Sequence, residues 1–202
     1  GLDYWWPKES DVDENLDLSQ GVYRRRGLAK AIYYKATAQD PSLNTTFDMP
    51  GSGRVAICVG LGGGTGGGTA LDIAKTIKWK KSPTSDVTLF GVLPSEYEND
   101  DVKTNAYTML SELEHLACNE DRELFRDIVL MPIDATEYEG KTGDGLGTED
   151  NLQEFDEAFG YVFISYYNHG QEKAFDQSPR YAPFTVAVPQ VLRYNIAAIE
   201  DT

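Results

Sequence analysis

The feature that most constrains this chain is the stretch of residues 60–70, in which seven of the eleven residues are glycine. A short apolar run at 55–59 precedes it and predicts a buried strand, and residues 70–78 follow with apolar residues at helical spacing. Glycines can adopt positive φ and let main-chain N–H groups approach an anion, and the start of a helix adds free donors and a positive dipole end. The order of strand, glycine loop and helix therefore predicts a phosphate-binding loop.

The glycine stretch could also be a flexible linker or another known phosphate-binding motif. Glycine clusters also form flexible linkers, but a linker does not require a strand before it and a helix after it. The stretch is not a Walker loop, because no Lys-Ser or Lys-Thr pair follows the last glycine, and it is not the usual dinucleotide fingerprint. A different phosphate-binding family is indicated.

Residues 62–68, Gly-Gly-Gly-Thr-Gly-Gly-Gly, resemble the signature of the tubulin/FtsZ superfamily, GGGTG[ST]G between a strand and a helix. The chain departs at Gly67, where the signature has Ser or Thr, and residues 69–74 resemble the Ala-Ala-Pro-x-Ile-Ala run of FtsZ. The resemblance implies an α/β fold: a Rossmann-like, three-layer domain with a mostly parallel sheet flanked by helices. It also implies that the domain binds GTP or GDP with Mg²⁺. The phosphate-binding residues would be Gly62, Gly63, Gly64, Thr65, Gly66 and Gly67.

Two further segments match parts of the superfamily site. Gly21 and Gly27 fall where FtsZ has a glycine loop over the γ-phosphate, followed by a helix. Pro94 and Glu98 match a Pro-Phe-x-Phe-Glu-Gly loop whose Glu contacts the ribose, and Asn105-Ala106 matches an Asn-Ala pair further on, although the arginine between them is missing. Glu98 could equally be a solvated loop acid.

The nucleoside side of the site is matched more loosely. Asp134 follows a predicted strand where FtsZ has an Asn that helps to bind the nucleoside. Asp156 aligns best with the residue of the long central helix that recognises guanine, and Asn151 and Phe155 are neighbours that could share this role. A carboxylate that accepts from N1–H and the 2-amino group selects guanine, because adenine has no such donor pair. Any one of these acids could instead belong to an ordinary N-terminal helix turn.

Arg24, Arg25 and Arg26 form a basic cluster close to Gly21. Three guanidinium groups could clamp phosphates, or they could form a solvated helix face that pairs with the abundant carboxylates.

Some parts of the superfamily pattern are not found in this sequence. Nothing before Leu18 resembles the first strand and its glycine loop, and no Asn-x-Asp-x-x-Asp catalytic loop follows residue 170. We therefore expect a single domain, 1–202, without the first strand and phosphate loop and without the C-terminal domain. The catalytic residues are unknown, so GTP hydrolysis is less well supported than binding.

The rest of the chain predicts alternating strands and helices. Strands are expected at 54–59, 87–93 and 127–134, and helices at 106–117 and 151–167, with a turn leading into another helix at 19–33. Strand, crossover helix and strand form a βαβ unit, and the glycine-rich stretch at 140–148 is expected to be a flexible loop.

The composition limits the partners. There are 33 acidic and 18 basic residues in 202, a net charge of −15, which argues against a general nucleic-acid or anionic-membrane surface. Acid spread over nearly every polar stretch suits a salt-adapted, haloarchaeal protein, or an ordinary acidic cytosolic one. No apolar stretch reaches the length of a membrane helix, and the two cysteines make no disulfide framework, so we expect a cytoplasmic protein.

Three functions follow from these observations. The leading hypothesis is a GTPase that assembles into cytoskeletal filaments with itself or with homologous tubulin-like subunits. The second is a non-hydrolysing scaffold of the same fold. The third is an unrelated Rossmann-type enzyme that binds another phosphorylated ligand.

Overall fold

A parallel sheet forms the centre of the protein in the computed structural model, which describes residues 21–22, 24–43, 53–81, 84–96, 98–118, 124–133, 149–169 and 183–188. The described strands lie in the order β1-β2-β3-β4, and every neighbouring pair is parallel. Their carboxyl ends therefore meet at one edge of the sheet. The strands are β1 (Arg54–Gly60), β2 (Asp86–Leu93), β3 (Asp127–Pro132) and β4 (Phe184–Val186).

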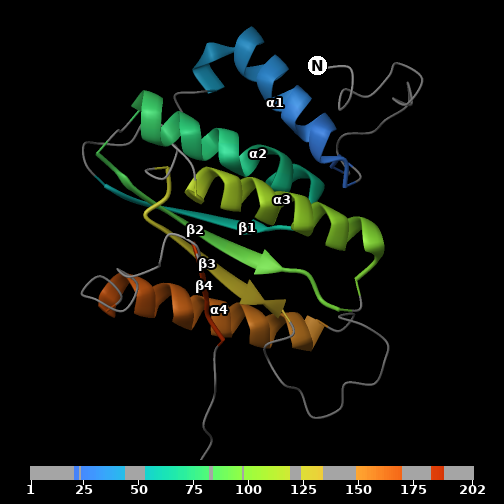
Figure 1. The fold of residues 1–202 in the computed structure, drawn as a ribbon, viewed down its shortest axis with the longest axis vertical. Coiled ribbons are helices and arrows are strands. Elements are labelled where there is room, and N and C mark those ends of the chain that lie inside the picture. Colours follow the sequence, from blue (N-terminus) through green and yellow to red (C-terminus); the bar gives the residue numbers. More distant parts are fainter. Residues whose placement is uncertain are drawn as a thin grey trace, which may run out of the picture.

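Four α-helices surround this sheet (Figure 1). Helices α2 and α3 cover one face, α4 covers the other, and α1 lies on the outer side of α2. The helices are α1 (Arg26–Gln39), α2 (Gly64–Lys75), α3 (Asp100–Cys118) and α4 (Glu149–His169), and α2 continues as a π-helical turn, Thr76–Lys81.

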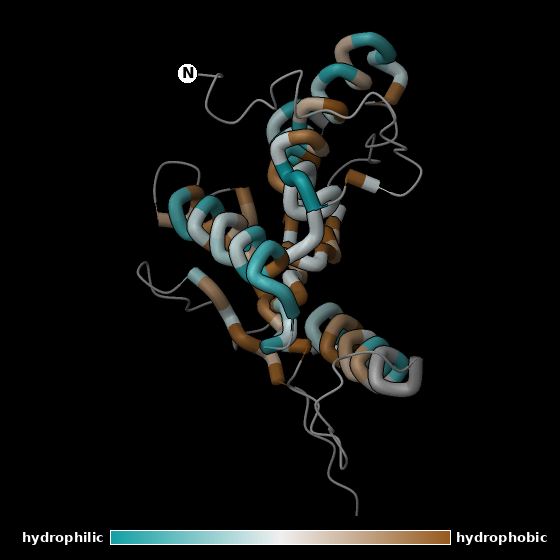
Figure 2. The backbone as a smooth tube through the Cα atoms, turned by 90° about the vertical axis from the view of Figure 1, so that its right-hand side faces the viewer, coloured by the Kyte–Doolittle hydropathy of each residue, from teal (hydrophilic) through white to brown (hydrophobic). Residues whose placement is uncertain are grey.

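Alternation along the strands explains why both faces are covered. On β2, Val87 and Leu89 pack with α2 and α3, whereas Phe90 packs with Tyr166 and other aromatic residues of α4. Both sets are fully or almost fully buried. In the view along the strands, hydrophobic residues of the sheet lie between the helices (Figure 2).

The predicted α/β fold with a parallel sheet flanked by helices is confirmed, and the strands at 87–93 and 127–134 agree with β2 and β3 within two residues. The prediction of a buried strand at 55–59 is only half right. In the sheet of described strands β1 is an edge strand: Val55 and Val59 are buried, but Arg54 and Cys58 are exposed. An apolar run does not distinguish a central strand from an edge strand whose inner face alone is buried.

The helix after the glycine stretch begins earlier than predicted. We expected it at residue 70, but α2 begins at Gly64, so five residues, 64–68, that include four glycines form its first turns. Helix propensity disfavours glycine here, and close packing against neighbouring backbone, described below, outweighs it. The helices at 106–117 and 151–167 are also longer than predicted, because α3 begins at Asp100 and α4 spans 149–169.

Some predictions lie outside the described residues. These are Asp134, the side chain of Asn151, the glycine-rich stretch at 140–148 and the segment before Gly21. The single-domain assignment also stays a prediction.

Candidate nucleotide-binding site

The first turn of α2 lies at the carboxyl edge of the sheet, directly after β1. The Leu61 N–H donates to the Val92 carbonyl at 3.0 Å, which ties the end of β1 to the end of β2. The Gly67 N–H donates to the Gly63 carbonyl at 3.2 Å and begins the helical ladder. The N–H groups of the preceding helical residues, 64–66, have no acceptor within the helix, and no side chain caps this end. This is the geometry that binds an anion at a helix start.

The surface of this turn consists of backbone and one hydroxyl. Gly60, Gly63 and Thr65 are exposed, and a Cβ built on Gly60 would meet no atom within 4 Å. A ligand could therefore approach the main chain closely. Thr65 adds the exposed side-chain hydroxyl in this first turn, so the residues suit phosphate oxygens.

The glycines themselves work differently from the expectation. Among the described glycines, Gly21 is the one with positive φ, whereas Gly63 has φ −75° and ψ 147°, which any residue can adopt. A Cβ at Gly64 would lie 2.7 Å from the backbone of Arg24, and one at Gly68 would lie 2.5 Å from the Arg26 carbonyl oxygen. At these two positions the missing side chain therefore allows the close approach of neighbouring backbone.

The segment before α1 is the backbone that approaches α2. Gly21 has φ 86°, and a Cβ built on it would lie 3.9 Å from the Thr65 hydroxyl oxygen. Arg24 has φ 63°, in the left-handed region that non-glycine residues rarely adopt, and Val22 is buried. The structure thus brings together Gly21 and Thr65, two predicted site residues that are more than forty positions apart in the sequence.

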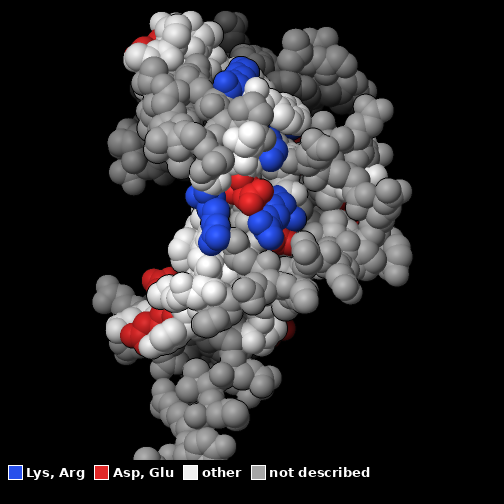
Figure 3. Space-filling model, turned by 90° about the vertical axis from the view of Figure 1, so that its left-hand side faces the viewer, with Lys and Arg blue, Asp and Glu red and all other residues white. Residues whose placement is uncertain are grey.

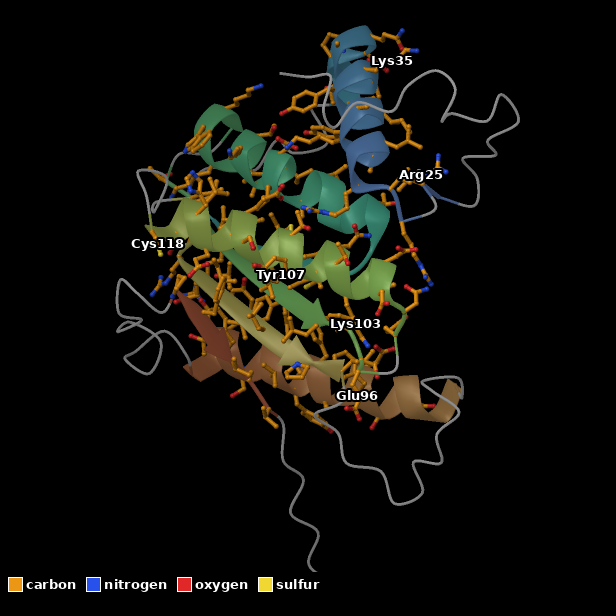
Figure 4. The ribbon with its side chains drawn as sticks, turned by 45° about the vertical axis from the view of Figure 1, so that its right-hand side comes forward. Arg25, Lys35, Glu96, Lys103, Tyr107 and Cys118 are labelled. Carbon is orange, nitrogen blue, oxygen red and sulfur yellow. The ribbon has the colours of Figure 1, made fainter. Side chains whose placement is uncertain are left out.

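The arginine cluster is divided in its roles. The Arg26 guanidinium donates to the Gly67 carbonyl at 3.0 Å through Nε and at 2.8 Å through Nη2, and Nη2 lies 2.6 Å from Glu112 Oε2 on α3. Its side chain is only 12% exposed. Arg26 therefore pairs with a carboxylate, as the second of our two interpretations expected, but it joins three helices instead of lying on a solvated face. Arg24 and Arg25 are exposed, and Arg25 lies at the start of α1 (Figure 4).

The connection from β2 to α3 forms the next part of this edge. Pro94 follows β2 directly and is half-buried. The Glu98 N–H donates to the Ser95 carbonyl at 3.2 Å, and the Asn99 side chain caps α3 by accepting from the Val102 N–H at 3.1 Å. Glu98 is half-buried between these two turns.

Lys103 holds the same connection from the helix side. Its ammonium group donates to the Glu96 carbonyl at 2.6 Å, and both residues lie at the start of α3, far from Cys118 at its other end (Figure 4). The connection is therefore fixed at both ends, and Pro94 and Glu98 share the carboxyl edge with the glycine stretch.

Asn105 was noted in the sequence only as part of a resemblance, and the structure gives it a place at the site. Its side-chain amide donates to the Arg24 carbonyl at 2.8 Å and to the Gly62 carbonyl at 3.3 Å. No local sequence signal predicts this bridge, because its partners lie 81 and 43 positions away.

Helix α4 presents its first half toward the same edge, but from the other face of the sheet. Its far end lies by the strand amino ends, because Tyr166 contacts Thr88 and Asp127 and the Tyr167 carbonyl accepts from Arg54. Asp156 is exposed in the first half of α4, and α4 lies on the opposite face of the sheet from α2. Phe155, which we considered as a base contact, is buried and packs against Phe159, so it belongs to the core.

The amino edge of the sheet has a different character. Arg126 Nη1 lies 2.9 Å from Asp86 Oδ2, and the Tyr166 hydroxyl donates to Asp127. Burial, and then the hydrogen bond to Asp127, raise the pKa of Tyr166. Figure 3 shows this side of the molecule, where basic and acidic groups gather together. The bond between Tyr166 and Asp127 holds α4 on the sheet, and the Arg126–Asp86 pair lies beside it, so the charged groups named here pair with one another.

The fold and the glycine-rich start of α2 together define a Rossmann-like α/β domain with a helix N-terminus at the carboxyl edge of its sheet. The chain belongs to the family described as "Tubulin like", whose model matches residues 22–191. This match removes our third hypothesis, an unrelated Rossmann-type enzyme.

A solved structure, CetZ from Methanosaeta thermophila strain DSM 6194, has a similar fold. The TM-score is 0.53 at 13% sequence identity, and the alignment covers 74% of this chain and 38% of the CetZ chain. This chain thus spans well under half the length of that protein. A comparison with curated proteins gives no significant match. In the described parts of the chain, none of the helices has the length and apolar character needed to cross a membrane.

Proposed function

We propose that this chain binds GTP and GDP with the phosphates on the first turn of α2. One observation carries the proposal: the N–H groups of residues 64–66 lie uncapped at the carboxyl edge of a parallel sheet, beside the exposed Thr65 hydroxyl. Ligands of open α/β sheets bind at this edge. The family and the fold of CetZ support a nucleotide as the phosphate ligand.

The other contacts of the nucleotide extend this proposal along the same edge. Gly21 would close over the terminal phosphate, because it lies beside Thr65. Pro94 and Glu98 would flank the ribose, with the Glu98 carboxylate accepting from a hydroxyl. Asp134, Asn151 and Asp156 would contact the guanine base, and the carboxylate of Asp156 would provide the selectivity over adenine.

The residues present also suit Mg²⁺ delivered with the phosphates. Mg²⁺ in nucleotide sites keeps several waters and takes one or two protein oxygens, and the Thr65 hydroxyl can supply one. Within the described ranges, no group of three or more His, Cys, Asp or Glu side chains forms a separate cation site. When bound, the ion would neutralise phosphate charge.

Hydrolysis is the second level of the proposal. In-line attack by water would be assisted by the main-chain N–H groups of residues 64–66, which stabilise negative charge on the phosphates. No residue is assigned as the general base that would activate the water. Binding without turnover would instead fit the non-hydrolysing scaffold of the same fold, so binding and turnover need separate measurements.

Calorimetry with GTP, GDP and ATP, each with Mg²⁺, tests the proposal. It is done in low salt and in molar KCl, because high salt screens the repulsion between the many acidic groups of this chain. We expect GTP and GDP to bind and ATP to bind at least about tenfold more weakly. Phosphate release and light scattering in the same solutions report hydrolysis and assembly. Failure of folded chain to bind any guanine nucleotide would contradict the proposal.

A charge variant makes this test specific to the first turn of α2. Thr65→Asp places a carboxylate where the phosphates would lie, and it leaves the fold intact because an acid in a first helical turn is favourable. We expect nucleotide affinity to fall by about tenfold or more while stability is unchanged or slightly higher. Thr69→Asp, one turn further along α2, is the matched control and should weaken binding less.

A further inference from the structure

Three stretches of backbone meet at the start of α2: the segment before α1, the glycine stretch and the start of α3. The side chain of Asn105, on α3, connects the first two. Asn105 Nδ2 donates to the Arg24 carbonyl, in the segment before α1, at 2.8 Å. It also donates to the Gly62 carbonyl, in the glycine stretch, at 3.3 Å. Asn105 thus uses its two amide hydrogens on two main-chain acceptors.

The segment that Asn105 holds has an unusual conformation. Gly21 and Arg24 both have positive φ, 86° and 63°, and the Arg25 N–H donates to the Val22 carbonyl at 2.9 Å to close a turn. A left-handed backbone at a non-glycine residue persists only when surrounding contacts impose it. The hydrogen bond from Asn105 to the Arg24 carbonyl is one such contact, and it acts at the strained residue itself.

The same helix also fixes the other partner. Val102, one turn before Asn105, packs so closely on Gly62 that a side chain there would collide with it. A Cβ at Gly64 would likewise collide with Arg24. The position of the segment at 21–25 over the first turn of α2 is therefore set from two sides, by α2 and by the start of α3.

We propose that Asn105 is a positioning residue that holds the segment 21–25 against the glycine stretch and thereby sets the affinity for the terminal phosphate. The inference rests on the proposed function, in which Gly21 closes over that phosphate. Asn105 itself does not need to contact the nucleotide. Its loss should therefore weaken the binding of a triphosphate more than that of a diphosphate.

The test compares Asn105→Leu with the wild-type chain and with Ser111→Ala. Leucine keeps the number and branching of the side-chain heavy atoms of asparagine and removes both donors, whereas Ser111 is exposed on the same helix and its hydroxyl donates to the Tyr107 carbonyl. We expect the GTP dissociation constant to rise about tenfold in Asn105→Leu and the GDP constant to change by less than about threefold. Amide hydrogen exchange at residues 21–26 should accelerate in this variant alone.

The outcomes separate the positioning role from the proposed function. Equal losses for GTP and GDP, or unchanged exchange at 21–26, would overturn the positioning role. A wild-type chain that binds neither nucleotide would contradict the proposed function and with it the link to the terminal phosphate, while the exchange rates would still report whether Asn105 holds the segment. Asn105→Ala, which raises helix propensity, repeats the comparison if Asn105→Leu does not fold.

Discussion

At the scale of single residues, the glycines of α2 differ in what they do, and this difference can be measured. A Cβ at Gly64 would lie 2.7 Å from backbone atoms of Arg24, whereas a Cβ at Gly63 would come no nearer than 3.4 Å to the Gly60 carbonyl oxygen. We predict that Gly64→Ala lowers the free energy of unfolding by about 1–3 kcal/mol, because backbone must move. Gly63→Ala should cost less, about 0.5–1 kcal/mol, which is the difference between glycine and alanine as N-caps.

Denaturant unfolding of both variants checks this prediction. The two substitutions add the same methyl group to neighbouring positions, so each is the control for the other. Equal losses would mean that close packing is not the reason for glycine at position 64.

Tyr34 provides a prediction about pH at the same scale. Its hydroxyl donates to Asp72 Oδ1 at 2.7 Å, on the side of α2 that faces α1, and Lys30 lies 3.4 Å from Asp72 Oδ2. Burial, followed by the hydrogen bond and the charge of Asp72, raises the pKa of Tyr34 from 10.0 to about 12. The folded state therefore favours the protonated phenol.

The raised pKa has a definite consequence for stability. The contribution of Tyr34 is fully present below pH 10, and it is lost as the pH rises from 10 to about 12. The stability difference between the wild-type chain and Tyr34→Phe should be constant from pH 7 to 9 and shrink above pH 10. A difference that grows above pH 10 would contradict the assignment. Unfolding curves of the two chains at matched pH measure it.

At the scale of elements, α1, α2 and α3 are joined by Arg26. Its guanidinium satisfies the Gly67 carbonyl and pairs with Glu112, which is 44% exposed. Arg26→Met should destabilise the fold by about 1–3 kcal/mol, because a part-buried carbonyl loses a charged donor. Glu112→Gln should cost less than about 1 kcal/mol, because the Glu112 carboxylate is partly exposed and the glutamine amide oxygen can still accept from Arg26.

The comparison of these two variants distinguishes a structural arginine from a phosphate ligand. If Arg26 bound phosphate instead, Arg26→Met would leave stability unchanged and reduce nucleotide affinity directly. Denaturant midpoints together with GTP titrations of the two variants give both quantities.

The sequence predicted which helices and strands exist better than it predicted where they begin and end. Near-continuous apolar runs predicted β2 and β3, since both strands bury two faces. The sequence did not predict the first turns of α2, because glycine has a low helix propensity. In the folded chain, close packing with Arg24 and Arg26 requires glycine in these turns. The edge position of β1 depends on strand order, which a local apolar pattern does not contain.

At the scale of the whole molecule, the superfamily resemblance predicted phosphate binding at the glycine stretch, and the fold places the N-terminus of α2 there, at the carboxyl edge of the sheet. The motif is contiguous, so the sequence could show it. The association of Gly21 with Thr65 and the bridge from Asn105 join residues more than forty positions apart, and only the folded chain reveals them. The role of Arg26 was left open in the sequence for the same reason, because Glu112 is 86 positions away.

The most direct test of the central claim is a ¹H–¹⁵N spectrum of the folded chain titrated with GTP and Mg²⁺. If the phosphates lie on the first turn of α2, the amide signals of Gly64, Thr65, Gly66 and Gly21 should shift most, while those at the amino edge, such as Asp86 and Asp127, should stay unchanged. Saturable binding that leaves the signals of residues 64–66 in place would contradict the claim.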